Sequence, residues 1–163
     1  MPLTPFQIEV MSVIAKNRRP ESHVARCAVL ERDERSIRYS DDFDIFQDPE
    51  EHVLKIAEAD AEALTNAGYV IRWLVKGADR SKAEVIAEGQ TVRLDWVIDS
   101  DFRFFPVQQD PLFGYCLHRA DLATNKVMAM SERVAPRDYL DVLHLVRTYL
   151  SLGALVWAAA LST

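Results

Sequence analysis

The sequence contains little glycine and cysteine and no long hydrophobic run. Its 163 residues include five glycines, none before Gly68, and two cysteines, Cys27 and Cys116. Two cysteines so far apart form neither a disulfide framework nor a zinc-binding spacing, which favours a reducing compartment, and we expect a cytoplasmic protein. The most apolar stretch, residues 152–161, is about half as long as a bilayer-spanning helix, so we expect no signal peptide and no membrane association.

Positive charge is also scarce. The formal net charge of −6 gives no general attraction to nucleic acid, so an RNA partner would need a local basic patch, and none is obvious. Metal-ligand spacing is absent from the four histidines, His23, His52, His118 and His144. Cys27 has no evident base nearby in the sequence, which argues against a thiol enzyme. The composition, 49% hydrophobic, is that of an ordinary globular protein. The chain is long enough for one domain with a helical appendage.

Apolar spacing and cap residues predict alternating helices and strands, then helices. Helices are predicted over residues 4–16, 28–34, 48–68, 121–130 and 136–150, with Asp48 as the cap of the third. Strands are predicted to end at residues 24–25 and to cover residues 38–46, 69–75, 82–87 and 91–98. We assign the chain to the α/β (α+β) class, with a mixed β-sheet flanked by helices over residues 1–118 and a helical part over residues 119–163.

The C-terminal run contains Leu152, Leu155, Val156, Trp157 and Leu161 and has no polar element to cover it. An apolar patch of this size usually has a partner. We expect it to pack back on the domain, on further helices that this chain lacks, or on a second copy in a homodimer. The tryptophans are interpreted as core residues because their neighbours are apolar; they are Trp73, Trp96 and Trp157.

Two carboxylates, Asp42 and Asp44, stand two residues apart on a half-buried strand. Side chains alternate along a strand, so Phe43 and Ile45 are expected to point into the core while both aspartates share the other face. Strand interiors disfavour aspartate, and like charges on one face repel each other. The pair therefore indicates a cation between the two carboxylates, with Mg²⁺ as the natural candidate.

Asp95 supplies a third carboxylate in a later apolar strand, on the face opposite Leu94 and Trp96. Three strand carboxylates suit two-metal phosphoryl transfer, because acids bridge the ions and one accepts a proton from the attacking hydroxyl. On spacing alone, purely structural roles for the three aspartates are equally open. In this structural interpretation Asp42 is a solubilising edge residue, Asp44 pairs within a turn, and Asp95 accepts a salt bridge.

Several motifs in this order resemble the AbiEii/AbiGii toxin family of nucleotidyltransferases. They are Arg38-x-Ser40-x-Asp42-Phe43-Asp44-Ile45-Phe46, then Asp95, then Asp121-Leu122-Ala123-x-Asn125-Lys126, and finally Pro136-Arg137-Asp138-Tyr139-x-Asp141. The resemblance covers roughly residues 4–157, and its last two motifs are the more specific. It implies a DNA polymerase β-like nucleotidyltransferase fold, a magnesium-bound nucleoside triphosphate, and a toxin of a toxin–antitoxin pair, some of which modify tRNA.

The resemblance also implies roles for single residues. Asp42 and Asp44 would bind Mg²⁺ or Mn²⁺, and Asp95 would complete the metal site or act as the base. Residues expected to contact the nucleotide are Arg26, Cys27, Arg38, Ser40 and Lys126, the last at the triphosphate, although most helix lysines are simply solvated. Asp138 and Asp141 are second-tier site residues with an equally open structural role at the start of a helix. Asp121 and Asn125 are interpreted as a helix cap and a local hydrogen-bonding residue.

One departure from the family pattern concerns the turn that meets the phosphates. Small residues, Gly-Gly or Gly-Ser, are expected there, but this chain has Arg26-Cys27, whose Cβ atoms narrow the approach. Two functions therefore remain open. One is an active nucleotidyltransferase, with a tRNA acceptor and an antitoxin as candidate partners. The other is a catalytically impaired relative that acts as a protein-binding module.

Overall fold

The computed structural model describes residues 3–25, 42–100, 102–133 and 135–162. The chain divides into two units, the first made of Met1–Asp101 and Val107–Leu117, the second of Phe102–Pro106 and His118–Thr163. The division expected after residue 118 lies next to the observed boundary between Leu117 and His118. A short segment before it, Phe102–Pro106, belongs to the helical unit as well.

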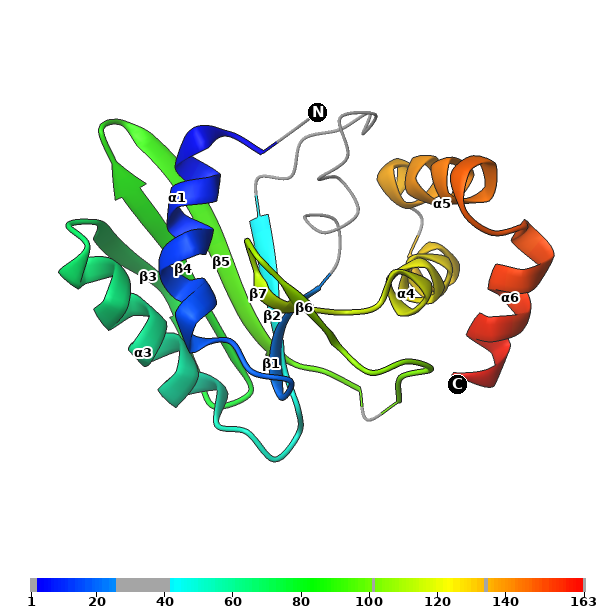
Figure 1. The fold of residues 1–163 in the computed structure, drawn as a ribbon, viewed down its shortest axis with the longest axis horizontal. Coiled ribbons are helices and arrows are strands. Elements are labelled where there is room, and N and C mark those ends of the chain that lie inside the picture. The colour runs from blue at the N-terminus through cyan, green and yellow to red at the C-terminus, as the bar shows by residue number, and fades with distance from the viewer. Residues whose placement is uncertain (1–2, 26–41, 101, 134, 163) are drawn as a thin grey trace. The chain divides into compact units, whose positions relative to one another are not determined.

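Within the described residues, the strands of the first unit form one seven-stranded mixed sheet in the order β3-β4-β5-β2-β1-β7-β6 (Figure 1). The strands are β1 Ser22–Ala25, β2 Asp42–Gln47, β3 Val70–Lys76, β4 Arg80–Ala87, β5 Gln90–Ile98, β6 Gln108–Asp110 and β7 Gly114–Cys116. β2 pairs with β5 in parallel, as β1 does with β7, and the other neighbouring strands are antiparallel. The mixed sheet flanked by helices confirms the predicted fold class.

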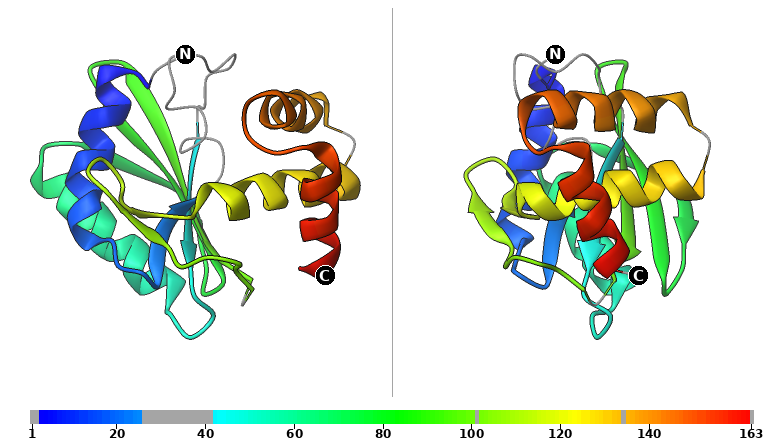
Figure 2. Two further views of the ribbon diagram at one scale, coloured as in Figure 1. Left: turned by 45° about the vertical axis from the view of Figure 1, so that its right-hand side comes forward. Right: turned by 90° about the vertical axis from the view of Figure 1, so that its right-hand side faces the viewer.

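Two helices, α1 Pro5–Ile14 and α3 Val53–Asn66, cover one face of this sheet (Figure 2). The start of α1 follows the sequence signal, since the side chains and backbones of Thr4 and Gln7 cap each other reciprocally. A short 3₁₀-helix, η1 Ala15–Asn17, extends α1. The helices and the sheet enclose the core, which includes Val10, Ile14, Phe43, Ile45, Leu64, Leu94 and Trp96.

The predicted start of α3 is wrong. The helix begins at Val53 rather than after Asp48, and no side chain caps it at His52. Asp48 is still tied to the sheet, because its N–H donates to the carbonyl of Glu21 at 2.9 Å while its own carbonyl accepts from Glu51 at 2.9 Å in a turn. β6 and β7 are strands that the sequence did not predict, and the predicted helix over residues 28–34 lies outside the described residues.

The second unit consists of α4 Arg119–Glu132, α5 Pro136–Thr148 and α6 Leu152–Leu161, with α5 and α6 both packed on α4 (Figure 2). His118 caps α4 by accepting the N–H of Ala120 at 3.1 Å, so Asp121 is not the cap. Instead Asp121 accepts from the backbone N–H groups of Phe104 at 2.7 Å and Phe105 at 3.2 Å, which fastens the segment Phe102–Pro106 to α4.

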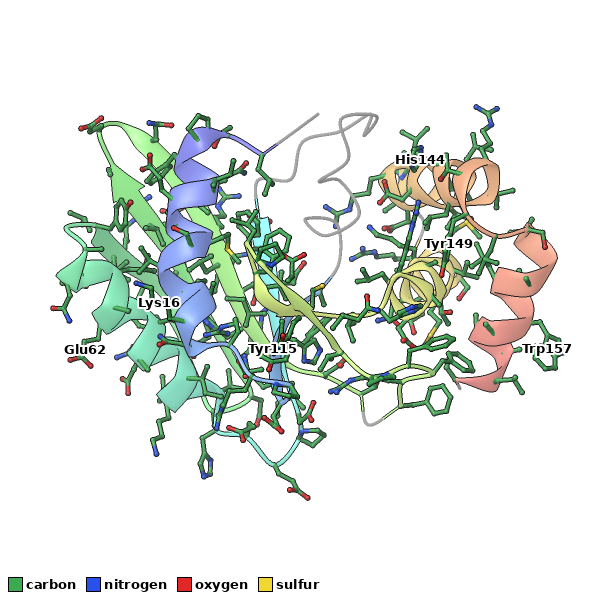
Figure 3. The ribbon with its side chains drawn as sticks, in the orientation of Figure 1. Lys16, Glu62, Tyr115, His144, Tyr149 and Trp157 are labelled. Carbon is green, nitrogen blue, oxygen red and sulfur yellow. The ribbon has the colours of Figure 1, made fainter. Side chains whose placement is uncertain are left out.

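The apolar run at residues 152–161 is mostly exposed, and only one side of its helix is covered. Leu155 and Ala159 are buried in the second unit, but Trp157 is 70% exposed and points away from its helix (Figure 3), so its interpretation as a core residue is wrong. In contrast, Trp96 is fully buried and Trp73 packs on the core beside it. The expected homodimer through this run stays a prediction.

Among the described helices, none is by itself long and apolar enough to cross a membrane. α5 and α6 reach that length and composition only together, and the pair is bent by 118°.

Candidate functional site

Asp42 and Asp44 lie on the face of the sheet that α1 and α3 do not cover. In β2 the exposure alternates, with Phe43 and Ile45 fully buried in the core and both aspartates partly exposed. This confirms that the two carboxylates share one face of a half-buried strand. β1 flanks them with a small residue, because Ala25 is the register partner of Asp44.

Asp95 is brought next to this pair by the parallel pairing of β2 with β5. Asp44 and Asp95 are direct register partners, and neighbouring strands lie about 4.8 Å apart. The adjoining residues Leu94 and Trp96 are buried in the core, so Asp95 lies on the opposite face, as predicted. The structure therefore gathers the backbone positions of all three predicted aspartates on one patch of the sheet.

The carboxylate of Asp95 is held by two cations of β4. Arg80 donates from Nε to Oδ1 at 2.9 Å and from its Nη2 to Oδ2, and the Nζ of Lys82 lies 3.4 Å from Oδ2. The Asp95 side chain is only 6% exposed, whereas that of Arg80 is 58% exposed. Asp95 thus accepts a salt bridge in this structure, as the structural interpretation of the sequence expected.

The electrostatics of this patch link Arg80 to both neighbouring aspartates. The hydrogen bonds and charge of Asp95, and to a smaller extent the charge of Asp44, raise the pKa of the Arg80 guanidinium above its ordinary value despite partial burial. Arg80 therefore stays positively charged beside both carboxylates.

A second row of charges crosses the same face. Arg72 donates from Nε to Glu84 at 2.8 Å, and Arg93 lies 3.3 Å from Glu84 and 3.8 Å from Asp42. The hydrogen bond from Arg72 is the main reason why the pKa of Glu84 falls below its usual range, although burial opposes the shift. Each acid on this face is flanked by arginine or lysine.

Sequence reasoning missed Arg80 and Lys82, yet a signal for them exists. β4 and β5 are joined by a two-residue turn, Glu88-Gly89, with φ of 50° and 76° at its two residues, and such a short hairpin fixes the register. Counting back from the turn places Lys82 opposite Asp95 and Arg80 on its diagonal. The sequence of the turn and the alternating charges of β4 were therefore enough to find them.

The donor set has the right chemistry for a divalent cation, because carboxylate oxygens are the ligands that Mg²⁺ and Mn²⁺ prefer. However, the part of the chain that the structure describes contains no group of three or more His, Cys, Asp or Glu side chains placed to hold a metal ion. Since Asp95 is bound by Arg80 and Lys82, it can join Asp42 and Asp44 only after it leaves Arg80.

The predicted nucleotide contacts are divided between residues outside the described ranges and one buried lysine. Arg26, Cys27, Arg38 and Ser40 lie outside the described residues. Lys126 lies in the second unit, where its side chain is 7% exposed and donates to Asp141 at 2.6 Å. Because Lys126 is buried and bonded to Asp141, it is not a solvated helix lysine. A triphosphate would have to compete with the Asp141 carboxylate for it. The contact of Lys126 with the triphosphate stays a prediction.

Asp138 is the buried centre of the same cluster, with a side chain that is 0% exposed. It accepts from Arg133 at 2.8 and 3.2 Å, and the Nζ of Lys126 lies 3.8 Å away. Burial alone would raise the pKa of Asp138, but the hydrogen bonds from Arg133 and the charges of Arg133, Lys126 and Arg137 lower it below its ordinary value. In the structure Asp138 and Asp141 join α5 to α4.

This lowered pKa gives the second unit an acid-sensitive contact. A carboxylate with a lowered folded pKa stabilises the fold above its unfolded pKa of about 3.9, and this contribution is lost as the pH falls through the folded value. Replacing Asp138 with Asn removes the charged acceptor, at a cost of about 1.5–3 kcal/mol near pH 7. We expect the difference in melting temperature between wild type and Asp138→Asn to narrow below pH 4. A difference that stays constant from pH 7 to pH 3 would contradict this role.

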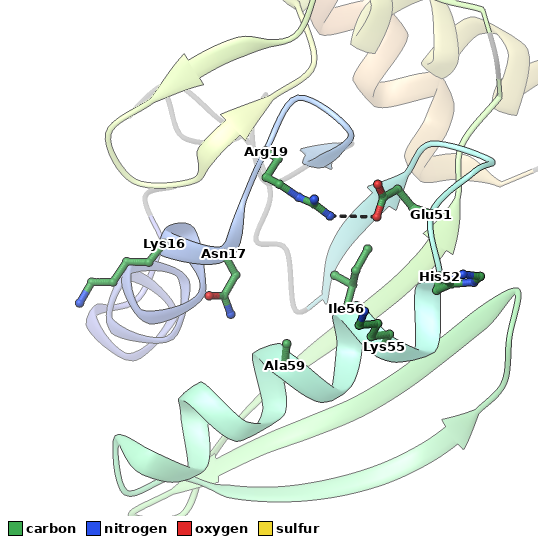
Figure 4. A pocket seen from close by; sticks show the side chains of 8 residues that line it. All are labelled: Lys16, Asn17, Arg19, Glu51, His52, Lys55, Ile56 and Ala59. Atoms are coloured by element: carbon green, nitrogen blue, oxygen red, sulfur yellow. Dashed lines mark hydrogen bonds and ion pairs between the residues drawn. The ribbon is translucent and has the colours of Figure 1, made fainter.

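A cavity of about 530 Å³ lies elsewhere in the first unit, between η1 and the start of α3 (Figure 4). Ile56 and Ala59 line it from α3, and the ion pair of Arg19 with Glu51 closes one side at 2.9 Å. Glu51 lies in the turn beyond the end of β2 at Gln47, whereas Asp42 begins that strand, so roughly 17 Å of extended strand separates the two ends. The cavity therefore does not belong to the aspartate patch.

Comparison with solved structures identifies the fold. The sequence matches no protein-family model and no curated protein. The structure is similar to JHP933 from Helicobacter pylori, with a TM-score of 0.64, 15% identity, and coverage of 90% of this chain and 68% of the other. It is also similar to a Helicobacter pylori protein assigned provisionally as a nucleotidyltransferase, with a TM-score of 0.64, 16% identity, and coverage of 88% and 67%. The chain therefore has a nucleotidyltransferase-like fold.

Proposed function

We propose that this protein is a metal-dependent nucleotidyltransferase that moves a nucleotide from a nucleoside triphosphate to an acceptor hydroxyl. One observation carries the proposal: Asp42, Asp44 and Asp95 occupy adjacent positions on one face of the sheet, within a nucleotidyltransferase-like fold. The fold alone would not suffice, because unrelated functions share folds. The constellation of acids on neighbouring strands adds the chemistry that phosphoryl transfer needs.

In this proposal the oxygen of the acceptor hydroxyl forms a bond to the α-phosphorus, and the bond from that phosphorus to the bridging oxygen of the β-phosphate breaks. Pyrophosphate leaves with the electron pair. Asp42 and Asp44 would hold Mg²⁺ or Mn²⁺, which supplies charge neutralisation at the phosphate oxygens. The hydroxyl proton passes to a carboxylate of the site. Asp95, in register with Asp44, either takes that proton or completes the metal site once Arg80 releases it.

The finer proposal is a toxin of the AbiEii/AbiGii type that modifies tRNA and is controlled by an antitoxin. Its support is the motif around Asp42 and the residues of the second unit that match the family pattern. In that unit Lys126, Asp138 and Asp141 form one buried cluster, so the matching residues of α4 and α5 lie in contact with one another.

We expect label from one of the four nucleoside triphosphates to appear on tRNA when wild type and Mg²⁺ or Mn²⁺ are present. Asp44→Asn should lower this transfer at least about a hundredfold, because the reacting phosphate loses a charged metal ligand. Asp79→Asn, which removes an exposed carboxylate from the turn before β4, is the matched control and should retain activity. Transfer that survives in Asp44→Asn would refute catalysis by the aspartate patch, and no transfer by a folded wild type onto any RNA acceptor would refute the tRNA-modifying proposal.

A second candidate is a protein-binding module, and the surface of the second unit favours it. Large apolar side chains are exposed on α5 and α6, among them Leu140, Leu143, Val156 and Trp157. Exposed apolar patches of this kind mark interaction sites more often than free surface. Binding of a partner protein by a chain that transfers no nucleotide would favour this function over catalysis.

A further inference from the structure

Two arginines on the open face of the sheet make the same kind of contact. Arg80 of β4 and Arg72 of β3 are 58% and 63% exposed, and each binds a nearly buried carboxylate of a neighbouring strand through Nε and Nη2. The carboxylates that the two arginines bind lie in different places. Arg72 holds Glu84, whereas Arg80 holds Asp95, the register partner of Asp44. Arg80 therefore sits on the proposed reaction site, and Arg72 does not.

Asp95 is unsuited to bind a metal ion while Arg80 holds it. Both of its carboxylate oxygens already accept hydrogen bonds, and Arg80 and Lys82 place two positive charges against its single negative charge. A divalent cation approaching Asp95 would meet this repulsion at short range in a partly buried setting, where screening is weak. Metal and guanidinium therefore compete for one carboxylate.

The two cations differ in how closely the protein surrounds them. The Lys82 side chain is 23% exposed and lies directly opposite Asp95 in the ladder, whereas Arg80 is 58% exposed and reaches Asp95 from the diagonal position. A planar guanidinium binds phosphate oxygens with the same paired geometry as a carboxylate. Arg80 can thus exchange Asp95 for a phosphate and keep its charged hydrogen bonds.

We propose that Arg80 is a positioning residue that keeps Asp95 from metal until substrate arrives and then moves from Asp95 to the triphosphate. This proposal rests on the proposed function of the same site. It predicts opposite effects of one substitution on two ligands. Without Arg80, Asp95 keeps only Lys82 at 3.4 Å and can join Asp42 and Asp44 more readily, so metal binds more tightly, whereas the triphosphate loses a guanidinium partner and binds more weakly.

The first measurement is calorimetric titration of the nucleotide-free protein with Mn²⁺. Arg80→Ala should bind Mn²⁺ about tenfold more tightly than wild type, because loss of one charged hydrogen-bond partner frees the carboxylate. Arg80→Lys should lie between the two. Arg72→Ala is the matched control: it removes an equally exposed arginine from the same face and should leave the Mn²⁺ affinity within about twofold of wild type.

The second measurement is binding of a non-hydrolysable triphosphate analogue at saturating Mn²⁺, where Arg80→Ala should bind about tenfold more weakly and Arg72→Ala as wild type does. Arg80→Gln, which keeps most of the side chain, replaces the alanine variant if that variant is less folded by circular dichroism. Unchanged or weaker Mn²⁺ binding in the Arg80 variants overturns the proposal, as does an equal gain in Arg72→Ala. Mn²⁺ binding that is insensitive to Asp44→Asn would instead refute the proposed function of the aspartate patch.

Discussion

Replacing Asp60 with alanine should lower the free energy of unfolding of the first unit by about 3–5 kcal/mol. The side chains of Asp60 and Arg18 are both completely buried and form an ion pair. Removing one partner of such a pair leaves an uncompensated charge away from water, which is far more costly than losing an exposed pair.

Asp60 also gathers donors from separate parts of the first unit. Besides Arg18, it accepts from the amide of Asn17 at 2.9 Å and from the indole nitrogen of Trp96 at 2.8 Å. Arg18 in turn donates to the hydroxyl of Ser22 at 2.9 Å. One carboxylate therefore links α3 to the end of η1 and to β5, the strand that carries Asp95.

The measurement is native-state hydrogen exchange of the amides in β5, because it reports the stability of the first unit separately from the helical unit. Glu58→Ala is the control on the same helix: its ion pair with Lys76 is exposed on both sides and should contribute less than about 1 kcal/mol. If Asp60→Ala and Glu58→Ala have equal small effects, the buried network does not stabilise the fold as we infer.

The sequence predicted those features that depend on local periodicity. Alternation along residues 42–46 placed Phe43 and Ile45 in the core and both aspartates outside, and the parallel pairing then brought Asp95 beside them. It could not identify Asp60, whose partner Arg18 is 42 residues away and which looks like any polar position of a helix. Long-range ion pairs have no local signal.

The two wrong predictions, a helix cap at Asp48 and a core position for Trp157, have similar physical causes. Asp48 resembles a helix cap, but its backbone N–H still donates to Glu21, the turn residue just before β1. Trp157 resembles a core residue by its apolar neighbours, but only the side of α6 that carries Leu155 and Ala159 faces α4. In both places the outcome depends on which other segment lies alongside, and composition does not specify that.

The second large effect concerns Gly114 in β7, where we expect alanine to cost about 2–5 kcal/mol. The residue has φ of +73°, a conformation that costs an L-residue roughly 1–2 kcal/mol. An added Cβ would also lie 2.4 Å from the carbonyl oxygen of Ala15 and 2.8 Å from the Cβ of Arg18. Neither atom is the end of a flexible side chain, so backbone must shift, and overpacking of this kind costs about 1–3 kcal/mol more.

Gly68→Ala separates the two contributions. Gly68 has φ of +95° at the end of α3, but nothing lies within 4 Å of an added Cβ, so only the conformational cost of about 1–2 kcal/mol applies. Chemical unfolding of both variants should therefore show the larger loss for Gly114→Ala. Because the clash involves Arg18, Gly114→Ala should also disturb the ion pair with Asp60, and combined with Asp60→Ala the losses should be less than additive. Equal losses for the two glycine variants would show that β7 yields without displacing Arg18, and full additivity would show that the two sites are independent.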